Sequence, residues 1–423
     1  MSLIHSSSSS SSLSSTPVNA NSIIASLGFG FGPIFWAPVS EVWGRRSGIL
    51  PGMFCLGIFS IAMASGKNAA SVFVSRFFAG LFGSASISNA VAGISDLWSR
   101  EARGTAISWY AVAVNGGPTL GPIIGAAIML NPNLGWWWTG YTHAIWVFTV
   151  VTVCFFCLPE LYPLVLLAHK AQQLRKETNN PKYYHPHENM KLDPRSIIIN
   201  QLSRPMKMLL TEPVIACIAF YAAFVYSVMY LALEVFPLAF QEARGWNPLT
   251  GSLPFLGLLI GILGVVGLNI WNQKHYEKVS RSTSAEPVPE DRLPLMAVGS
   301  ICFAVGLFWF AWTAKPLNHW ILPCLAAVLI GAGCESIFQQ SINFLIDMYK
   351  IYSASATAGI TFLRSVMAAG LPLAAKPMIR ALDIGPAVSI IGAVGAILLP
   401  VPFLFMRYGP TLRKMSKLAP DDP

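Results

Sequence analysis

Charged residues are scarce in this chain of 423 residues. Asp, Glu, Lys and Arg make up 11% of it, against about 25% in an ordinary soluble domain. Hydrophobic residues make up 54%, and the mean hydropathy is +0.55. This composition excludes a disordered chain, a basic nucleic-acid-binding domain and most soluble enzymes. It predicts an all-α integral membrane protein with no nucleic-acid partner.

Cysteines are also few, and they lie within apolar stretches rather than in loops. The seven residues are Cys55, Cys154, Cys157, Cys217, Cys302, Cys324 and Cys334. This placement favours buried thiols over a disulfide framework or a zinc site. We therefore expect no metal and no cofactor.

The N-terminal segment lacks charge altogether. No Lys, Arg, Asp or Glu precedes Glu41, and Ser6 to Ser12 form an unbroken serine run. Such a tract is typical of disorder, and the basic start of a secretory signal is missing. We expect a disordered tail over residues 1–20.

Long apolar runs dominate the rest of the chain. A bilayer-crossing helix needs about 20 such residues, and the predicted spans are Asn21–Val42, Ser47–Gly66, Ala69–Ile94, Ala102–Met129, Trp136–Leu158, Pro213–Phe240, Pro248–Trp271, Pro294–Ala314, His319–Ile346, Ser353–Leu382 and Ile384–Met406. A long polar stretch separates five spans from six. We therefore predict two helix bundles, at 21–158 and 213–406, joined by a cytoplasmic loop at 159–212 and followed by a cytoplasmic tail at 407–423.

The basic residues support this topology. If the loop that carries Arg45 and Arg46 is cytoplasmic, most of the 28 Lys and Arg residues fall on the cytoplasmic side, including those of the central loop and the tail. The opposite side receives only Lys67, Arg244, Lys315 and Arg380. The positive-inside rule then predicts a cytoplasmic C-terminus.

The turn between the first two predicted spans groups opposite charges. Glu41 ends the first span, and Gly44 permits a tight turn. Arg45 and Arg46 follow, and their guanidiniums can form charge-assisted hydrogen bonds with a neighbouring helix end. We expect these residues to form a polar cluster, here called the clasp, that stabilises one of the two arrangements of the helix bundles. The alternative is a basic turn that only sets the topology.

An arginine lies inside the third predicted span. Arg76 is followed by Gly80 and Gly83, small residues that permit close helix packing. An unpaired guanidinium in a membrane is costly, so we expect Arg76 to face the bundle interior or water and to find a partner. A purely structural hydrogen-bonding role is the alternative to a functional one.

The fourth predicted span carries the most distinctive stretch, Asn115–Gly125. Its glycines and two prolines are Gly117, Pro118, Gly121, Pro122 and Gly125. The prolines remove backbone donors and kink the helix. We expect the glycines to let a neighbouring helix pack tightly; a generic kinked packing helix is the alternative to a specialised one.

These motifs together resemble those of the major facilitator superfamily. The segment Gly32–Arg46 is similar to the loop signature between the family's second and third helices, although Ala37 and Glu41 stand where the family has Gly and Asp. The Arg76 segment is similar to the fourth-helix motif. The Asn115–Gly125 stretch resembles the antiporter signature in the fifth helix of proton-coupled exporters.

Further stretches resemble the fungal twelve-span drug:proton antiporter branch, which includes cycloheximide-resistance, polyamine and secondary-metabolite exporters. These stretches are Asp96–Trp98, Glu101–Gly104, Leu158–Pro163, Glu234–Pro237, Pro289–Leu293, Phe344–Tyr349, Phe362–Ser365 and Pro402–Phe405. The resemblance implies that Asp96 and Arg103 belong to the clasp and that Arg76 takes part in proton coupling. It also implies a major facilitator fold of two bundles with six helices each.

Three carboxylates of the second half are candidate proton carriers: Glu234 and Glu335, which fall within predicted spans, and Asp347, near the cytoplasmic end of the helix that carries Glu335. Proton coupling requires a group that gains and loses a proton near neutral pH, and burial can bring a carboxyl group into that range. Glu335 departs from the family pattern, so substrate selection is an alternative role for it. For Asp347 we favour a helix-end cap or an ion pair near Lys350.

The resemblance implies a transporter rather than an enzyme. It implies export of a small organic compound in exchange for protons by alternating access, by a monomer in the plasma membrane. The alternatives are a polyamine or other small-molecule facilitator and a truncated, non-transporting membrane protein. The family has a helix before the span that ends at Glu41, and the serine tract stands in its place. We expect a reading frame that lacks its first exon, with a naturally shortened protein as the alternative.

Overall fold

A computed structural model of the chain describes residues 16–98, 103–131, 133–189, 203–283, 292–349 and 353–415. Within these ranges the chain is helical and contains no strand. The elements are α1 (Thr16–Trp43), α2 (Arg45–Ala64), α3 (Ala69–Leu97), α4 (Arg103–Met129), α5 (Trp137–Cys157), α6 (Pro163–Thr178), η1 (Pro186–Asn189), α8 (Arg204–Thr211), α9 (Pro213–Phe236), η3 (Pro237–Glu242), η4 (Thr250–Ser252), α10 (Phe255–Thr283), α11 (Leu293–Thr313), α12 (Ile321–Tyr349), α13 (Ser353–Leu382), α14 (Ile384–Leu398) and α15 (Pro400–Met415).

Among these residues, 10 helical segments are long and apolar enough to cross a membrane. They are Arg45–Ala64, Ala69–Leu97, Gly104–Met129, Trp137–Cys157, Pro213–Glu242, Thr250–Trp271, Leu293–Thr313, Ile321–Tyr349, Ser355–Leu382 and Ile384–Gly409. Each one overlaps a predicted span. A helix suits a lipid environment because every backbone N–H and C=O group between its ends is paired within the segment.

The remaining predicted span, Asn21–Val42, lies in α1, which is not among the 10 segments. The division into five and six spans therefore stays a prediction. Helix α1 begins at Thr16 rather than at Asn21, so the end of the expected tail is helical. The serine run lies outside the described residues.

The described helices form two compact units. Unit 1 holds Met1–Arg103 and Trp136–Arg204, with α1, α2, α3, α5 and α6. Unit 2 holds Gly104–Gly135 and Pro205–Pro423, and so includes α4. By its place in the chain α4 was expected in the first bundle. It lies with unit 2, and Ser108 and Asn115 of its buried face form hydrogen bonds with α12.

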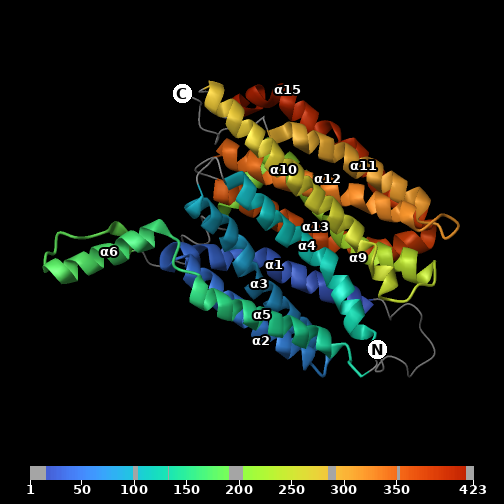
Figure 1. The fold of residues 1–423 in the computed structure, drawn as a ribbon, viewed down its shortest axis with the longest axis horizontal. Helices are drawn as coiled ribbons and strands as arrows, with labels where there is room; N and C mark the ends of the chain where they lie inside the picture. The colour runs from blue at the N-terminus through green and yellow to red at the C-terminus, as the bar shows by residue number, and fades with distance from the viewer. Residues whose placement is uncertain are drawn as a thin grey trace. The chain divides into compact units, whose positions relative to one another are not determined.

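Close packing of α1 against α3 depends on glycine. In unit 1, α1 packs along α3 and α2 packs on both α3 and α5 (Figure 1). A Cβ atom added to Gly80 would lie 2.2 Å from the carbonyl oxygen of Ala25, and one added to Gly28 would lie 2.2 Å from that of Phe77. The backbones therefore approach to a distance that no side chain permits, as small residues in membrane helices allow.

Aromatic side chains fill the core of unit 2. Phe236 of α9 stacks on Phe310 of α11, with ring centroids 5.2 Å apart, and lies 4.7 Å from the ring of Phe255 on α10. All three side chains are buried. Because aromatic rings bury large areas and prefer offset or tilted contacts, they fix α9, α10 and α11 against one another.

The predicted central loop contains helices. Helix α6 follows α5 and projects beyond the other helices of unit 1 (Figure 1). Beyond it, Nη2 of Arg175 donates to Oε2 of Glu188 at 2.6 Å, which ties η1 back to α6. This hydrogen bond lowers the pKa of the Glu188 carboxyl below its usual value. Hydropathy marks this region only as polar, so the helices were not predicted.

We predict that Gly80→Ala destabilises unit 1 by about 1–3 kcal/mol, because the added methyl group forces α1 away from α3. The matched control is Gly83→Ala, whose Cβ would lie 3.5 Å from the side chain of Leu56, an ordinary contact distance. Thermal unfolding of the detergent-solubilised variants measures the difference. Equal losses of stability in the two variants would contradict the packing described for α1 and α3.

Candidate functional site

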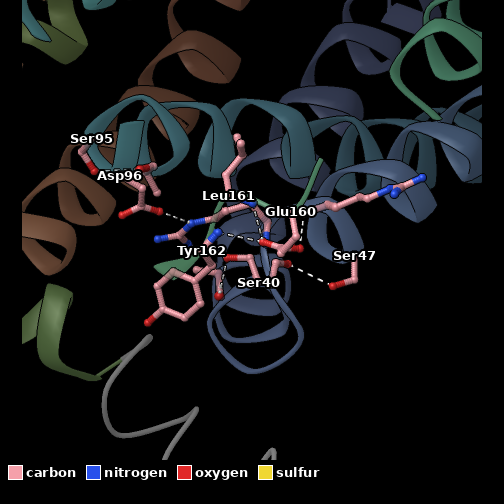
Figure 2. Close-up of polar contacts among 12 residues, drawn as sticks. Ser40, Ser47, Ser95, Asp96, Glu160, Leu161 and Tyr162 are labelled. Carbon is pink, nitrogen blue, oxygen red and sulfur yellow. Dashed lines mark hydrogen bonds and ion pairs between the residues drawn. The ribbon is translucent and has the colours of Figure 1, made fainter. Parts of the chain in front are cut away.

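The first site is a clasp at the start of α2, formed by Ser40, Arg45, Arg46, Asp96, Glu160 and Tyr162 (Figure 2). Gly44 joins α1 to α2 with φ of 96°, a conformation that favours glycine. A Cβ atom at Gly44 would also lie 2.2 Å from Oε2 of Glu160. Gly44 is therefore required both by the turn and by the carboxylate beside it.

The Glu160 carboxylate caps the start of α2. The first N–H groups of a helix have no partner within it, and here Oε1 accepts from Arg45 N–H at 2.7 Å and Oε2 from Arg46 N–H at 3.1 Å. Oε1 also accepts from the N–H groups of Leu161 and Tyr162, each at 2.9 Å. An anion at this position is favourable because the N-terminus of a helix carries partial positive charge.

The Arg45 side chain connects three more parts of unit 1. Its Nε donates to Oδ2 of Asp96 on α3 at 2.8 Å, and its Nη1 donates to Oγ of Ser40 on α1 at 2.9 Å. Its guanidinium lies 4.6 Å from the centre of the Tyr162 ring. Burial and the nearby Glu41 carboxylate raise the pKa of Tyr162, so the phenol stays neutral and offers its π face to the cation.

Arg46 binds the end of α5. Its Nη2 donates to the carbonyl oxygen of Phe155 at 2.7 Å, and its guanidinium lies 5.3 Å from the Phe155 ring centre. A cation is favourable there because the C-terminal carbonyl groups of a helix carry partial negative charge. The two arginines thus join α2 to α1, α3 and α5.

The second site is a buried polar cluster within unit 2, formed by Ser108, Asn115, Asn269, Glu335, Gln339 and Gln340. Nδ2 of Asn115 on α4 donates to Oε2 of Glu335 on α12 at 2.6 Å. Glu335 is 0% exposed and Asn115 is 1% exposed. A carboxyl group is therefore buried in a membrane helix with a neutral partner.

The rest of this cluster forms a chain of neutral hydrogen bonds. Nε2 of Gln339 donates to Oγ of Ser108 on α4 at 2.5 Å, while its Oε1 accepts from Nδ2 of Asn269 on α10 at 2.5 Å. Nε2 of Gln340 donates to Oδ1 of Asn269 at 2.9 Å. Buried amides need such partners, and α4, α10 and α12 supply them to one another.

A buried arginine lies in the same unit. The guanidinium of Arg364 on α13 lies 4.3 Å from the ring centre of Tyr226 and 5.1 Å from that of Phe338. Its side chain is 3% exposed. Two aromatic faces stabilise this cation in an otherwise apolar setting.

A family model described as Major Facilitator Superfamily matches residues 3–372. The chain belongs to this superfamily. Its members are transporters rather than enzymes, and the buried groups above are therefore parts of a transporter.

Fungal exporters are among the similar proteins. The multidrug transporter FLU1 of Candida albicans is 38% identical over 408 residues, which cover 96% of this chain and 67% of FLU1. The efflux pump bik6 of Gibberella fujikuroi is 38% identical over 405 residues, covering 95% and 83%. The citrinin biosynthesis cluster transporter mrr1 of Monascus ruber is 36% identical over 396 residues, covering 93% and 79%. The predicted family resemblance is confirmed.

Solved structures confirm the fold class. The human organic anion transporter MFSD10 aligns with a TM-score of 0.62 at 16% identity and covers 92% of this chain and 83% of its own. The xylose transporter XylE from E. coli aligns with a TM-score of 0.61 at 15% identity, covering 93% and 86%. At this identity the likeness shows the major facilitator fold alone.

The structure brings together only part of the predicted clasp. Arg45, Arg46, Asp96 and Gly44 meet as described, but Glu41 makes no hydrogen bond among the described residues. The Arg103 side chain lies outside them. The carboxylate that caps α2 is Glu160, to which the sequence had assigned no role. Its only signal was the Leu158–Pro163 stretch that resembles the exporter branch.

Two predicted proton-carrier candidates form ion pairs. Oε2 of Glu234 lies 3.2 Å from Nζ of Lys376 on α13. Oδ2 of Asp347 lies 3.3 Å from Nε of Arg292. Arg292, directly before α11, thus supplies an ion-pair partner at the end of α12. Lys350, near which an ion pair was expected, lies outside the described residues.

The described residues show no hydrogen-bond or ion-pair partner for Arg76. The side chain is exposed. Its charge interacts with His143 of α5, whose Nδ1 lies 3.0 Å from Oγ of Ser60. The partner of Arg76 therefore stays a prediction.

The glycines of α4 do not pack as expected. A Cβ atom at Gly117, Gly121 or Gly125 would meet no described atom within 4 Å. Gly117 and Gly121 lie on the exposed face of α4, opposite the buried face that carries Asn115. Pro118 and Pro122 do lie inside the helix, as predicted.

We predict that Glu160→Ala accelerates hydrogen exchange at the amides of Arg45 and Arg46 by about tenfold or more, because buried donors without an acceptor cost about 1–3 kcal/mol. Mass-spectrometric exchange on the purified protein measures this. The control is Glu188→Ala, which removes a carboxylate that pairs with Arg175 instead. Equal exchange at the start of α2 in wild type and Glu160→Ala would show that the carboxylate does not cap this helix.

Proposed function

We propose that this transporter exports a small organic compound in exchange for protons by alternating access, with its C-terminus on the cytoplasmic side. The names of FLU1, a multidrug transporter, and bik6, an efflux pump, support export of such a compound. The observation that carries proton coupling is the buried Glu335 carboxyl group with its neutral partner Asn115.

Glu335 suits proton exchange better than the other two carboxylates. Protonation of Glu234 or Asp347 would leave Lys376 or Arg292 without its counterion, and an unpaired cation in a membrane protein is costly. Protonation of Glu335 leaves no cation unpaired. A proton on Glu335 also removes a negative charge from a site with 0% exposure, where charge is least well solvated.

The clasp supports the conformational part of the proposal. Alternating access needs two bundle arrangements of similar free energy. The Arg45 and Asp96 ion pair holds the ends of α2 and α3 together, so its strength contributes to the stability of one arrangement. Arg76 and the Gly117–Gly125 stretch of α4 are further candidates for coupling and helix bending.

We predict that Glu335→Gln abolishes accumulation driven by a pH gradient while leaving the protein folded, because the amide is nearly isosteric and cannot release a proton. Proteoliposomes with an imposed pH gradient measure the uptake of rhodamine 6G and of a panel of amphipathic organic compounds. Wild-type protein should accumulate at least one of them.

The matched control is Glu242→Gln, which also replaces a carboxylate by an amide, at an exposed position of η3. It should keep gradient-driven accumulation. Unchanged accumulation in Glu335→Gln would exclude this residue as the proton carrier. If the wild-type protein only equilibrates the compound across the membrane, whatever the pH gradient, it is a facilitator.

A further inference from the structure

Two buried oxygen atoms of unit 2 lie on groups that are already joined. Nδ2 of Asn115 donates to Oε2 of Glu335 at 2.6 Å. The other oxygen of each group, Oδ1 of Asn115 and Oε1 of Glu335, is buried and has no hydrogen bond among the described residues. Each group therefore uses one of its two polar atoms in the hydrogen bond, and its other polar atom has no partner among the described residues.

The unpaired atoms are both acceptors when the carboxyl group is ionised. A carboxylate and an amide oxygen can only accept, whereas a protonated carboxyl group has one O–H donor. A proton on Oε1 of Glu335 would supply that donor, and Oδ1 of Asn115 is the acceptor that lacks one. A single proton would thus satisfy both buried oxygens, each of which costs about 1–3 kcal/mol when unpaired.

We propose that Asn115 is a positioning residue that binds the protonated form of Glu335 through two hydrogen bonds and so couples protonation of α12 to the conformation of α4. The proposal rests on the proposed function, in which Glu335 carries the proton. In the loading step an O–H bond forms on Oε1 as a hydronium ion releases its proton and becomes water. In the unloading step that O–H bond breaks and water takes the proton.

A second hydrogen bond joins α4 to α12 and gives α4 a fixed end. Ser108 remains bonded to Gln339 whatever the charge of Glu335, because both groups are neutral. Loss of the proton therefore removes one of the two hydrogen bonds at Asn115 and leaves the one at Ser108. Beyond Asn115, Pro118 and Pro122 lack backbone donors, so this end of α4 bends more easily than a continuous helix.

The helices packed around Glu335 carry few competing groups. The titratable side chains that they contribute to unit 2 are Tyr110 of α4, Cys217, Tyr221, Tyr226, Tyr230 and Glu234 of α9, Cys302 of α11, Arg364, Lys376 and Arg380 of α13, and Cys324, Cys334, Asp347 and Tyr349 of α12 itself. Arg364 lies against aromatic rings, and Glu234 and Lys376 pair with each other. The described side chains of α10 include none, since Asn269 is neutral. Asn115 is thus the group that contacts the Glu335 carboxyl directly.

Hydrogen exchange on the purified, full-length protein tests this coupling. In wild type we expect the amides from Asn115 to Met129 to exchange about two- to tenfold more slowly in acidic than in alkaline buffer, after correction with an unstructured peptide. This range corresponds to one added hydrogen bond. The Glu335→Gln variant should show slow exchange in both buffers, because its amide can donate to Oδ1 of Asn115 as the protonated acid does. Asn115→Leu should show fast exchange in both.

Thr119→Val is the matched control, because Thr119 shares the buried face of α4 but bonds only its own helix, at the carbonyl oxygen of Gly116. It should keep the wild-type response. A response that persists in Glu335→Gln or Asn115→Leu would overturn the proposal, and so would its absence in wild type. If Asn115→Leu does not fold, Glu335→Gln alone still decides. This exchange experiment uses no substrate and no pH gradient. If α4 shows the pH-dependent exchange but the transport assay shows no proton-driven accumulation, the proposed function is overturned and the coupling of Glu335 to α4 is still supported.

Discussion

A polar or charged side chain inside a lipid-embedded helix needs a partner from the protein, and this requirement organises both units. In unit 1, the Arg45 guanidinium has Asp96, Ser40 and the Tyr162 ring around it. In unit 2, the Arg364 guanidinium lies against aromatic faces, and the amides of α10 and α12 form hydrogen bonds with one another. The helices are held in place by these contacts as well as by apolar packing.

The two units share one ion-pair construction. In unit 1 an arginine at the start of α2 pairs with an aspartate near the end of α3, Arg45 with Asp96. In unit 2 an arginine just before α11 pairs with an aspartate near the end of α12, Arg292 with Asp347. Consecutive antiparallel helices bring the end of the second helix back to the start of the first, so the paired residues lie at similar separations, 51 residues in unit 1 and 55 in unit 2. Such recurrence is expected of a transporter whose halves are structural repeats.

The sequence predicted the helices well, because length and hydropathy determine what can cross a bilayer. It also predicted that Arg45, Arg46 and Asp96 act together. It did not predict Glu160 as the cap of α2, since that carboxylate is distant in sequence and its role depends on where α5 ends. The Asn115 and Glu335 contact was missed for the same reason. The hydropathy pattern places neither residue on a particular helix face, and α4 was expected to pack in the first bundle. The Arg292 partner of Asp347 was not predicted, because partner choice depends on which helix ends meet.

The most direct test of the account is the movement of protons by the substrate. Proteoliposomes that contain pyranine as an internal pH indicator, with no imposed pH gradient, receive a gradient of a transported compound identified in the uptake assay. Proton-coupled export predicts that substrate flow in one direction drives protons in the other, and that Glu335→Gln removes this proton movement. Substrate flow through the wild-type protein with no change of internal pH would contradict the account.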